Sequence, residues 1–151
     1  MKHWLMKSEP TVYSIDHLAR NKTTLWEGVR NYQARNFMMK DMKVGDEFIF
    51  YHSNAEPSCA VGIGRIKSVG VPDLTALNKK SEYYDAKATK DNPIWYCVEV
   101  EFLEKFAHPQ TLDDLRAVPA LSNMLLLKRG QRLSVQPLAP LEFKAICQMG
   151  T

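Results

Sequence analysis

A chain of 151 residues that is 45% hydrophobic and 25% charged has the composition of one globular domain, which excludes disordered and fibrous classes. No apolar run approaches the roughly 20 residues that cross a bilayer, and we expect neither a membrane span nor a signal peptide. The net charge is +3, but residues 1–45 hold eight basic and four acidic side chains, residues 46–110 seven and ten, and residues 111–151 five and three. A localised basic face could meet phosphate, and scattered solvated charge explains the same numbers equally well.

The residues that would signal catalysis or metal binding are not arranged in known patterns. Cys59, Cys97 and Cys147 lie far apart without a Cys-x-x-Cys pair, which predicts separate reduced thiols in a cytoplasmic protein. None of the four histidines stands in a zinc-enzyme motif, and no nucleophile elbow or phosphate loop occurs. His52 and Ser53 could form a catalytic pair, but adjacent strand residues point to opposite faces. We therefore expect no catalytic residue, no cofactor and no metal.

The first predicted elements are a strand and a short helix. The strand covers Lys2–Lys7 and ends before Pro10, which disfavours helix at the residue in front of it. The helix covers Ser14–Ala19, with Ser14 as its N-cap. An extended piece over Thr23–Trp26 follows.

The segment Trp26–Phe37 has an unusual mixture of an indole, a phenol, two guanidiniums and three carboxamides. Aromatic faces stack on planar rings, carboxamides read base edges, and guanidiniums pair with phosphate. The mixture indicates a pocket for a flat, hydrogen-bonding ring on a phosphate backbone. A helix from Asn31 to about Met42, with Asn31 as its N-cap and Trp26 as a core plug, explains the same residues. Both interpretations stay open at this point.

The clearest hydrophobic run predicts the centre of a sheet. Glu47–Ser53 is expected to be a central strand, joined by a hairpin loop over Asn54–Pro57 to an antiparallel strand over Cys59–Val71. Gly62 and Gly64 fall on one face of that second strand. They predict that an aromatic ring or another backbone passes close to it.

The second half of the chain completes an α+β pattern. Asp73–Pro93 is charged and predicts a long excursion with one helical turn near Thr75–Leu77, followed by an alternating strand over Trp95–Phe106. The remaining predicted elements are short helices at Thr111–Arg116 and after Pro119, extended pieces over Leu125–Gly130 and Arg132–Gln136, and a final helix over Leu141–Cys147. Short strands separated by small helices predict a small curled sheet or open barrel.

Four ordered motifs resemble the EVE domain family. They are Trp4-x-x-Lys7-Ser8-Glu9-Pro10, Trp26-x-Gly28-Val29-Arg30-Asn31-Tyr32-Gln33-Ala34-Arg35-Asn36, Gly45-Asp46 with Tyr51-His52-Ser53, and Leu133-Ser134-Val135-Gln136-Pro137. The resemblance runs nearly end to end and implies one EVE domain over residues 1–151. It also implies the PUA-like fold, a curled β barrel with flanking short helices.

The resemblance carries functional expectations as well. PUA-like proteins and the related YTH domains bind RNA, and EVE relatives are thought to bind modified bases in DNA or RNA. YTH domains hold a methylated adenine in an aromatic cage, with a Lys-Ser pair after the first strand and a cage tryptophan before the next helix. These positions correspond to Lys7, Ser8 and Trp26 here. The other two cage walls have no certain counterpart in this sequence.

We therefore expect a module that binds a modified base in DNA or RNA and is not an enzyme. Trp26 would stack on the base, while Asn31 and the backbone near Val29 and Arg30 would read its edge. The predicted base pocket contains Ser8, Glu9, Trp26, Val29, Arg30, Asn31, His52, Ser53 and Ser134. The predicted phosphate-binding residues are Lys7, Arg30, Arg35 and Arg132. Of these residues, Ser8, Trp26, Asn31 and His52 are predicted to converge on one cavity.

Two alternatives remain at this stage. The same pocket could belong to an enzyme that acts on a modified nucleotide, or the domain could bind a small metabolite or a protein. Binding to nucleic acid should weaken steeply as salt rises, whereas metabolite binding should change little. An enzyme would alter its ligand with time.

Overall fold

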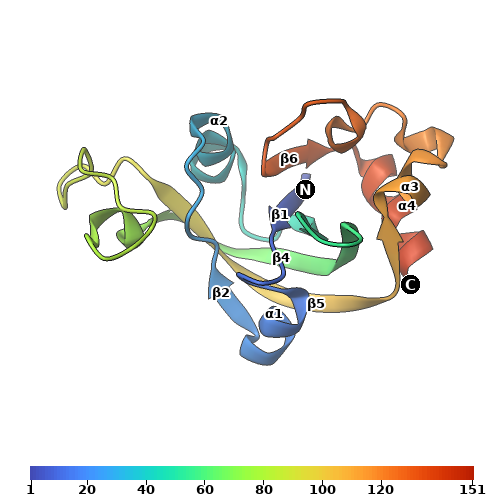
Figure 1. Ribbon diagram of the computed structural model, residues 1–151, viewed down its shortest axis with the longest axis horizontal. Coiled ribbons are helices and arrows are strands. Elements are labelled where there is room, and N and C mark those ends of the chain that lie inside the picture. Colours follow the sequence, from blue (N-terminus) through green and yellow to red (C-terminus); the bar gives the residue numbers. More distant parts are fainter.

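The computed structural model covers residues 1–151 and consists of one curled sheet with short helices around it (Figure 1). The strands are β1 (His3–Ser8), β2 (Thr23–Leu25), β3 (Glu47–His52), β4 (Cys59–Pro72), β5 (Tyr96–Thr111) and β6 (Val135–Leu138). The helices are α1 (Ile15–Asn21), α2 (Tyr32–Asn36), α3 (Leu112–Arg116) and α4 (Pro140–Gly150). Single turns of other helix types are η1 (Phe37–Asp41), η2 (Leu74–Leu77), η3 (Pro119–Leu121) and η4 (Leu125–Leu127). The predicted α+β class is confirmed.

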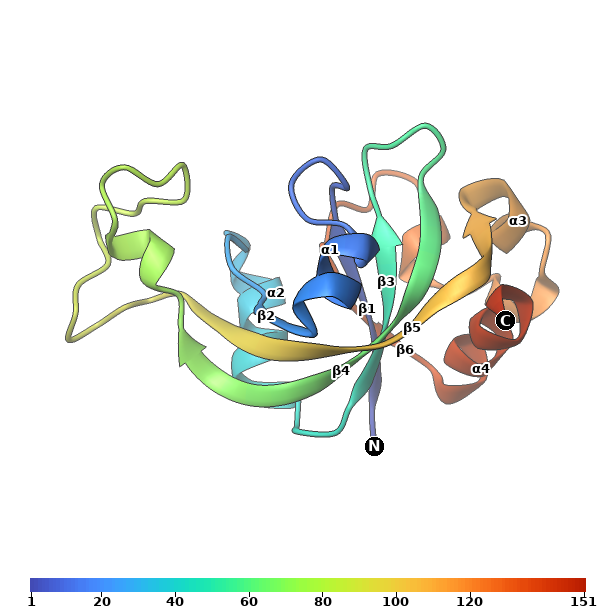
Figure 2. The ribbon, with the colours of Figure 1, turned by 90° about the horizontal axis from the view of Figure 1, so that it is seen from below.

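The six strands are ordered β2-β5-β4-β3-β1-β6, so β2 and β6 form two open edges and the sheet does not close into a barrel. β1 runs parallel to β3, and every other neighbouring pair is antiparallel. The predicted antiparallel pairing of Glu47–Ser53 with Cys59–Val71 is confirmed in β3 and β4. Register shifts along β4 and β5 accompany the curve of these two long strands across the molecule (Figure 2).

The alternation of side chains along the central strands divides the buried residues between two cores. In β3, Phe48 and Phe50 enter the first core, together with residues of α1 and α2. Ile49 and Tyr51 enter the second core, which α3 and α4 cover. The first core lies under the segments that carry the predicted site.

Two glycines of β4 allow the close packing that their spacing predicted. A Cβ atom at Gly62 would collide with the Glu104 carbonyl and the Ile15 side chain. A Cβ atom at Gly64 would collide with the ring of Phe48. The prediction of a close aromatic ring or backbone at these positions is confirmed.

Polar side chains begin the short helices as predicted. The Ser14 hydroxyl accepts a hydrogen bond from the His17 N–H at 3.2 Å, and the Thr111 hydroxyl accepts one from the Asp114 N–H at 3.1 Å. The longest helix, α4, has 11 residues, and none of the helices has the length and apolar character needed to cross a membrane.

The structure corrects three of the predicted elements. The helix expected from Asn31 to Met42 is divided into α2 and the π-helical turn η1. The extended piece expected over Leu125–Gly130 contains the 3₁₀ turn η4, because Leu126 turns into the second core. The piece expected over Arg132–Gln136 becomes a strand only at Val135, where pairing with β1 begins.

Candidate functional site

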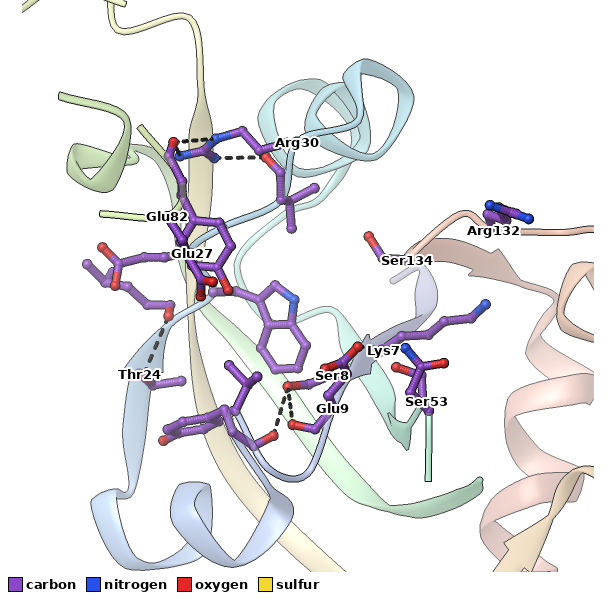
Figure 3. Close-up of a pocket in the computed structure, with 18 of the residues that line it drawn as sticks. Lys7, Ser8, Glu9, Thr24, Glu27, Arg30, Ser53, Glu82, Arg132 and Ser134 are labelled. Atoms are coloured by element: carbon purple, nitrogen blue, oxygen red, sulfur yellow. Dashed lines mark hydrogen bonds between the residues drawn. The ribbon is translucent and has the colours of Figure 1, made fainter. Parts of the chain in front are cut away.

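The larger of two cavities has a volume of about 690 Å³. Its lining includes residues of the β1–α1 loop and the β3–β4 turn, which rise from the same side of the sheet (Figure 2). Its walls come from the end of β1, from β2 and the segment after it, from the β3–β4 turn, and from the chain before β6 (Figure 3). The sequence-predicted residues that line it are Lys7, Ser8, Glu9, Trp26, Val29, Arg30, Ser53, Arg132 and Ser134. Nine of the twelve predicted site residues, although far apart in sequence, therefore line one cavity.

Three predicted site residues do not line this cavity, because their side chains are bonded elsewhere. Asn31 caps α2, where its Oδ1 accepts from the Ala34 N–H at 3.0 Å. His52 Nε2 accepts from the Ile15 N–H at 3.1 Å, at the start of α1. Arg35 donates to a backbone carbonyl just before β5 at 2.9 Å. This placement corrects the prediction that Asn31 and His52 share the cavity with Ser8 and Trp26, and it places Arg35 away from a ligand there.

Trp26 belongs to the first core and also forms part of the cavity wall. It is 6% exposed and packs edge-on against Phe48 and Phe50, with ring centroids 5.8 and 5.2 Å away. It also lines the cavity, and its indole N–H makes no hydrogen bond within the protein. Trp26 is thus a member of the first core whose free N–H donor is available to a ligand.

Arg30 lines the cavity, but its guanidinium is fully used within the protein. Nε and Nη2 donate to the Tyr83 carbonyl at 3.0 and 2.8 Å. Nη1 donates to the Val29 carbonyl at 2.9 Å and to the Asp73 carboxylate at 3.0 Å, and Nη2 also donates to the Thr75 hydroxyl at 3.0 Å. Arg30 therefore clamps residues 73–83 to the segment after β2. This corrects the prediction that it is free to bind phosphate.

The buried carboxylate of Asp73 is the acidic partner in this clamp. It also accepts from the Gly28 N–H at 2.9 Å and from the Thr75 N–H at 3.0 Å. Burial raises the pKa of Asp73, but the donors of Thr75, Gly28 and Arg30 together outweigh burial, so its pKa lies below the ordinary value of 3.8. Asp73 is held as a charged, well-bonded anchor.

The clamp positions Tyr83, a wall residue that sequence reasoning missed. Gly28 has a φ of +86°, and a Cβ atom there would lie 2.7 Å from the Tyr83 ring. The ring therefore packs directly on the backbone two residues after Trp26. The only local sign of this role is an adjacent Tyr83-Tyr84 pair within a strongly charged stretch.

Charges are divided between two sides of the cavity. Lys7 and Arg132 lie on one side and take part in no salt bridge within the protein, while Glu27 and Glu82 lie on the other (Figure 3). A third carboxylate, that of Glu9, lies on the side of Lys7 and accepts from Asn54 Nδ2 at 2.6 Å. Burial lowers the pKa of Lys7 from 10.5. Two unpaired cations facing two carboxylates suit a ligand that is anionic at one end and rich in donors at the other.

The floor of the cavity is fixed by backbone bonds and carries free hydroxyls. The Lys7 N–H donates to the Ser134 carbonyl at 2.8 Å, and the Ser53 N–H donates to the Ser8 carbonyl at 3.1 Å. The Ser8 hydroxyl donates to the Tyr13 carbonyl at 2.8 Å. The hydroxyls of Ser53 and Ser134 make no hydrogen bond within the protein, so they are available as donors or acceptors.

Comparisons with known proteins place the chain in a family. Its sequence matches the EVE domain over residues 2–149. The chain belongs to the EVE domain family. Human thymocyte nuclear protein 1 is 39% identical over 166 residues, which cover 97% of this EVE domain and 73% of the human protein. A crystal structure of a protein from Pseudomonas putida is 44% identical, covers 99% of each chain and has a TM-score of 0.94.

A second solved structure bears directly on ligands. The crystal structure of the human THYN1 protein in complex with DNA containing 5-methylcytosine matches this EVE domain with a TM-score of 0.93 and 38% identity. The match covers 99% of this EVE domain and 98% of the human chain in that structure.

The cysteine thiols of this EVE domain lie away from the cavity. Burial raises the pKa of the Cys97 thiol to about 12 and that of Cys147 to about 11, and it also raises the pKa of Cys59. None of these cysteines lines the cavity, and no group of three or more His, Cys, Asp or Glu residues could hold a metal. The cavity of the EVE domain offers hydrogen-bond donors, acceptors and cations, which are the means of recognising a polar ring linked to phosphate.

Proposed function

We propose that this EVE domain binds DNA carrying a modified base, of the 5-methylcytosine type, and holds that base in the 690 Å³ cavity. The observation that carries the proposal is the human relative, 38% identical over nearly the whole domain, whose structure contains DNA with 5-methylcytosine. The cavity supports it, because its volume lies within the range of about 300–1,000 Å³ typical of ligand sites.

The lining residues fit the edge of a cytosine. Cytosine presents an amine donor beside two acceptors, whereas thymine presents acceptors on either side of a donor. The carboxylates of Glu27 and Glu82 can accept from the amine, and the free N–H of Trp26 can donate to a ring acceptor. Tyr83 and Trp26 supply aromatic surface for the ring.

The unpaired cations fit the phosphates that flank the base. Arg132 and Lys7 lie on the side opposite the two glutamates, so a base directed at the carboxylates would leave its phosphates near Arg132. Base stacking contributes roughly 1–3 kcal/mol, while flipping a base from a duplex costs a few kcal/mol. Single strands and bases that are already exposed are therefore the favoured targets.

We also propose that the domain binds its ligand without changing it chemically. No histidine or cysteine lines the cavity: His52 accepts from the Ile15 N–H, and the cysteines are thiols whose pKa values burial raises. Mass spectrometry of an oligonucleotide recovered after long incubation should find it unchanged. A new mass that grows with time would favour the enzyme alternative.

The test measures fluorescence anisotropy of labelled single strands that differ only in one base: cytosine, 5-methylcytosine, 5-hydroxymethylcytosine or thymine. We expect tighter binding of a modified cytosine and a steep loss of affinity with rising salt. Equal affinity for all four strands would contradict base recognition. Binding of free nucleosides with an affinity that does not change with salt concentration would favour a metabolite-binding module.

Variants separate the base and phosphate roles. Arg132→Ala should weaken binding of all four strands alike, and it should reduce by about one the slope of log affinity against log salt concentration. Arg116→Ala is the control, because Arg116 lies on α3 outside the cavity, and it should change neither quantity. Trp26→Phe should reduce the preference among bases. It is preferable to Trp26→Ala, because removing a buried tryptophan costs about 3–5 kcal/mol of stability.

A further inference from the structure

The loop between β1 and α1 carries an exposed apolar side chain at the rim of the cavity. Val12 is 56% exposed, and it is also one of the residues that line the cavity. Of the large apolar side chains that the fold leaves exposed, only Val12 and Leu25 share both properties. Single exposed apolar residues are common, so the position of Val12 beside the cavity, and not its exposure alone, sets it apart.

The backbone around Val12 is braced on both sides. The N–H groups of Val12 and Tyr13 both donate to the Glu9 carbonyl at 2.9 Å, and the Ser8 hydroxyl donates to the Tyr13 carbonyl at 2.8 Å. The Tyr13 hydroxyl in turn accepts from Asn21 Nδ2 at 3.0 Å, at the end of α1. Val12 is thus presented on a turn that both neighbouring elements hold in place.

The position of this loop distinguishes Val12 from Leu25. The loop rises from the same side of the sheet as the β3–β4 turn and residues 73–93 (Figure 2). Each of these three segments contributes residues to the lining of the cavity. Leu25 instead lies within β2, paired with Glu99 of β5, so the sheet holds it as part of the wall. Val12 is the apolar group that can project past the rim toward a bound duplex.

We infer that Val12 is a wedge, which enters the base stack of a DNA duplex and fills the gap left by a base turned out into the cavity. The inference rests on the proposed function. Many proteins that kink DNA insert an apolar side chain between base steps, and a base that is turned out of a duplex needs a pocket within reach. Here the wedge and the pocket share a wall, and the cations Lys7 and Arg132 line the same cavity.

A wedge can act only on stacked base pairs, so its loss should affect binding of a duplex and not binding of a single strand. Binding is measured for one sequence with a single 5-methylcytosine, both as a duplex and as a single strand, to wild type and to Val12→Ser. Val44→Ser is the matched control, because Val44 is 66% exposed and lies outside the cavity. A 2-aminopurine beside the modified base reports unstacking by its fluorescence.

We expect Val12→Ser to weaken binding of the duplex by about tenfold, because serine loses the gain from moving an exposed apolar side chain out of water and between bases. Single-strand binding should change by less than about twofold. The 2-aminopurine fluorescence of the bound duplex should be lower with Val12→Ser than with wild type. Val44→Ser should match wild type in both affinity and fluorescence. Equal weakening of duplex and single strand, or no weakening of either, would overturn the wedge. Wild type that binds the modified single strand but never the duplex overturns the wedge and leaves the proposed function standing, whereas wild type that binds neither overturns both.

Discussion

Replacing Arg30 by methionine tests whether the clamp holds the wall of the cavity. Methionine keeps much of the length and apolar contact of the side chain but removes all five N–H donors. The Tyr83 carbonyl loses two hydrogen bonds, and the Val29 carbonyl and the Thr75 hydroxyl lose one each. Asp73 loses its only cationic partner.

The structure sets the size of the effect. Breaking a buried ion pair costs about 3–5 kcal/mol when the remaining charge is left bare. Asp73 keeps the donors from Gly28 and Thr75, and the Arg30 side chain is itself 22% exposed, so the cost is smaller. We expect a loss of about 2–3 kcal/mol at pH 7. Arg65→Met is the control, because the Arg65–Glu101 pair is 43% and 28% exposed and such pairs contribute about 0–1 kcal/mol.

The effect should depend on pH in a defined direction. In the wild type the folded-state pKa of Asp73 is below 3.8, so its stabilisation is fully present above that pH and is lost as pH falls through the folded-state value. Without Arg30, the pKa of Asp73 in the folded state rises. The difference in stability between wild type and Arg30→Met should therefore be larger at pH 7 than at pH 3.

Two measurements follow the loss. Urea unfolding gives the global free energy of unfolding, and hydrogen exchange shows whether residues 73–93 open separately. The Asp85 N–H, which donates to the Ala76 carbonyl at 2.9 Å, should exchange faster in Arg30→Met, while amides of β3 follow global stability. If Arg30→Met costs no more than Arg65→Met and leaves exchange at Asp85 unchanged, Arg30 does not act as a clamp.

Three further predictions concern stability. Lys7→Met should stabilise the free protein, because it removes a desolvated cation without a partner, and it should weaken DNA binding; equilibrium unfolding and anisotropy on the same samples would show whether the two effects are opposite. Gly28→Ala should cost about 1 kcal/mol more than Gly45→Ala, because both have positive φ but only Gly28 lies against a ring; equal losses in thermal unfolding would speak against that contact. The stability contributed by neutral His52, whose pKa burial lowers from 6.5, should be present above pH 6.5 and decrease as pH falls through the lowered value; an unfolding pH series in which His52→Gln keeps the same slope would disprove this role.

Most helices and strands could be predicted from the sequence, because N-caps and hydrophobic patterns act over only a few neighbouring residues. Ser14 and Thr111 cap the helices expected from their sequence context, and Phe48 and Phe50 lie in the expected central strand. The parallel pairing of β1 with β3 was not predicted, since no local pattern encodes which strands become neighbours.

Prediction of the site residues from sequence failed in two ways, through a side chain with two possible uses and through hydrogen bonds between distant residues. Asn31 was a candidate base reader because of its carboxamide, but a carboxamide is also a good cap, and the cap bond to the Ala34 N–H directs Asn31 to α2 and not to the cavity. Tyr83 illustrates the second. It becomes part of the wall through a bond to Arg30 across 53 positions, and nothing near Tyr83 in sequence announces that partner.

The division of the buried side chains by the sheet into two cores has a consequence for how the protein can change. Side chains such as Phe48 and Trp26 support the cavity, whereas Ile49, Tyr51 and the buried faces of α3 and α4 pack on the far side. Substitutions in that second layer can raise or lower stability without reshaping the ligand-binding surface, because distant sites contribute nearly independently. Stabilising substitutions on one side of the sheet can therefore offset the destabilising effect of substitutions that change ligand specificity on the other side.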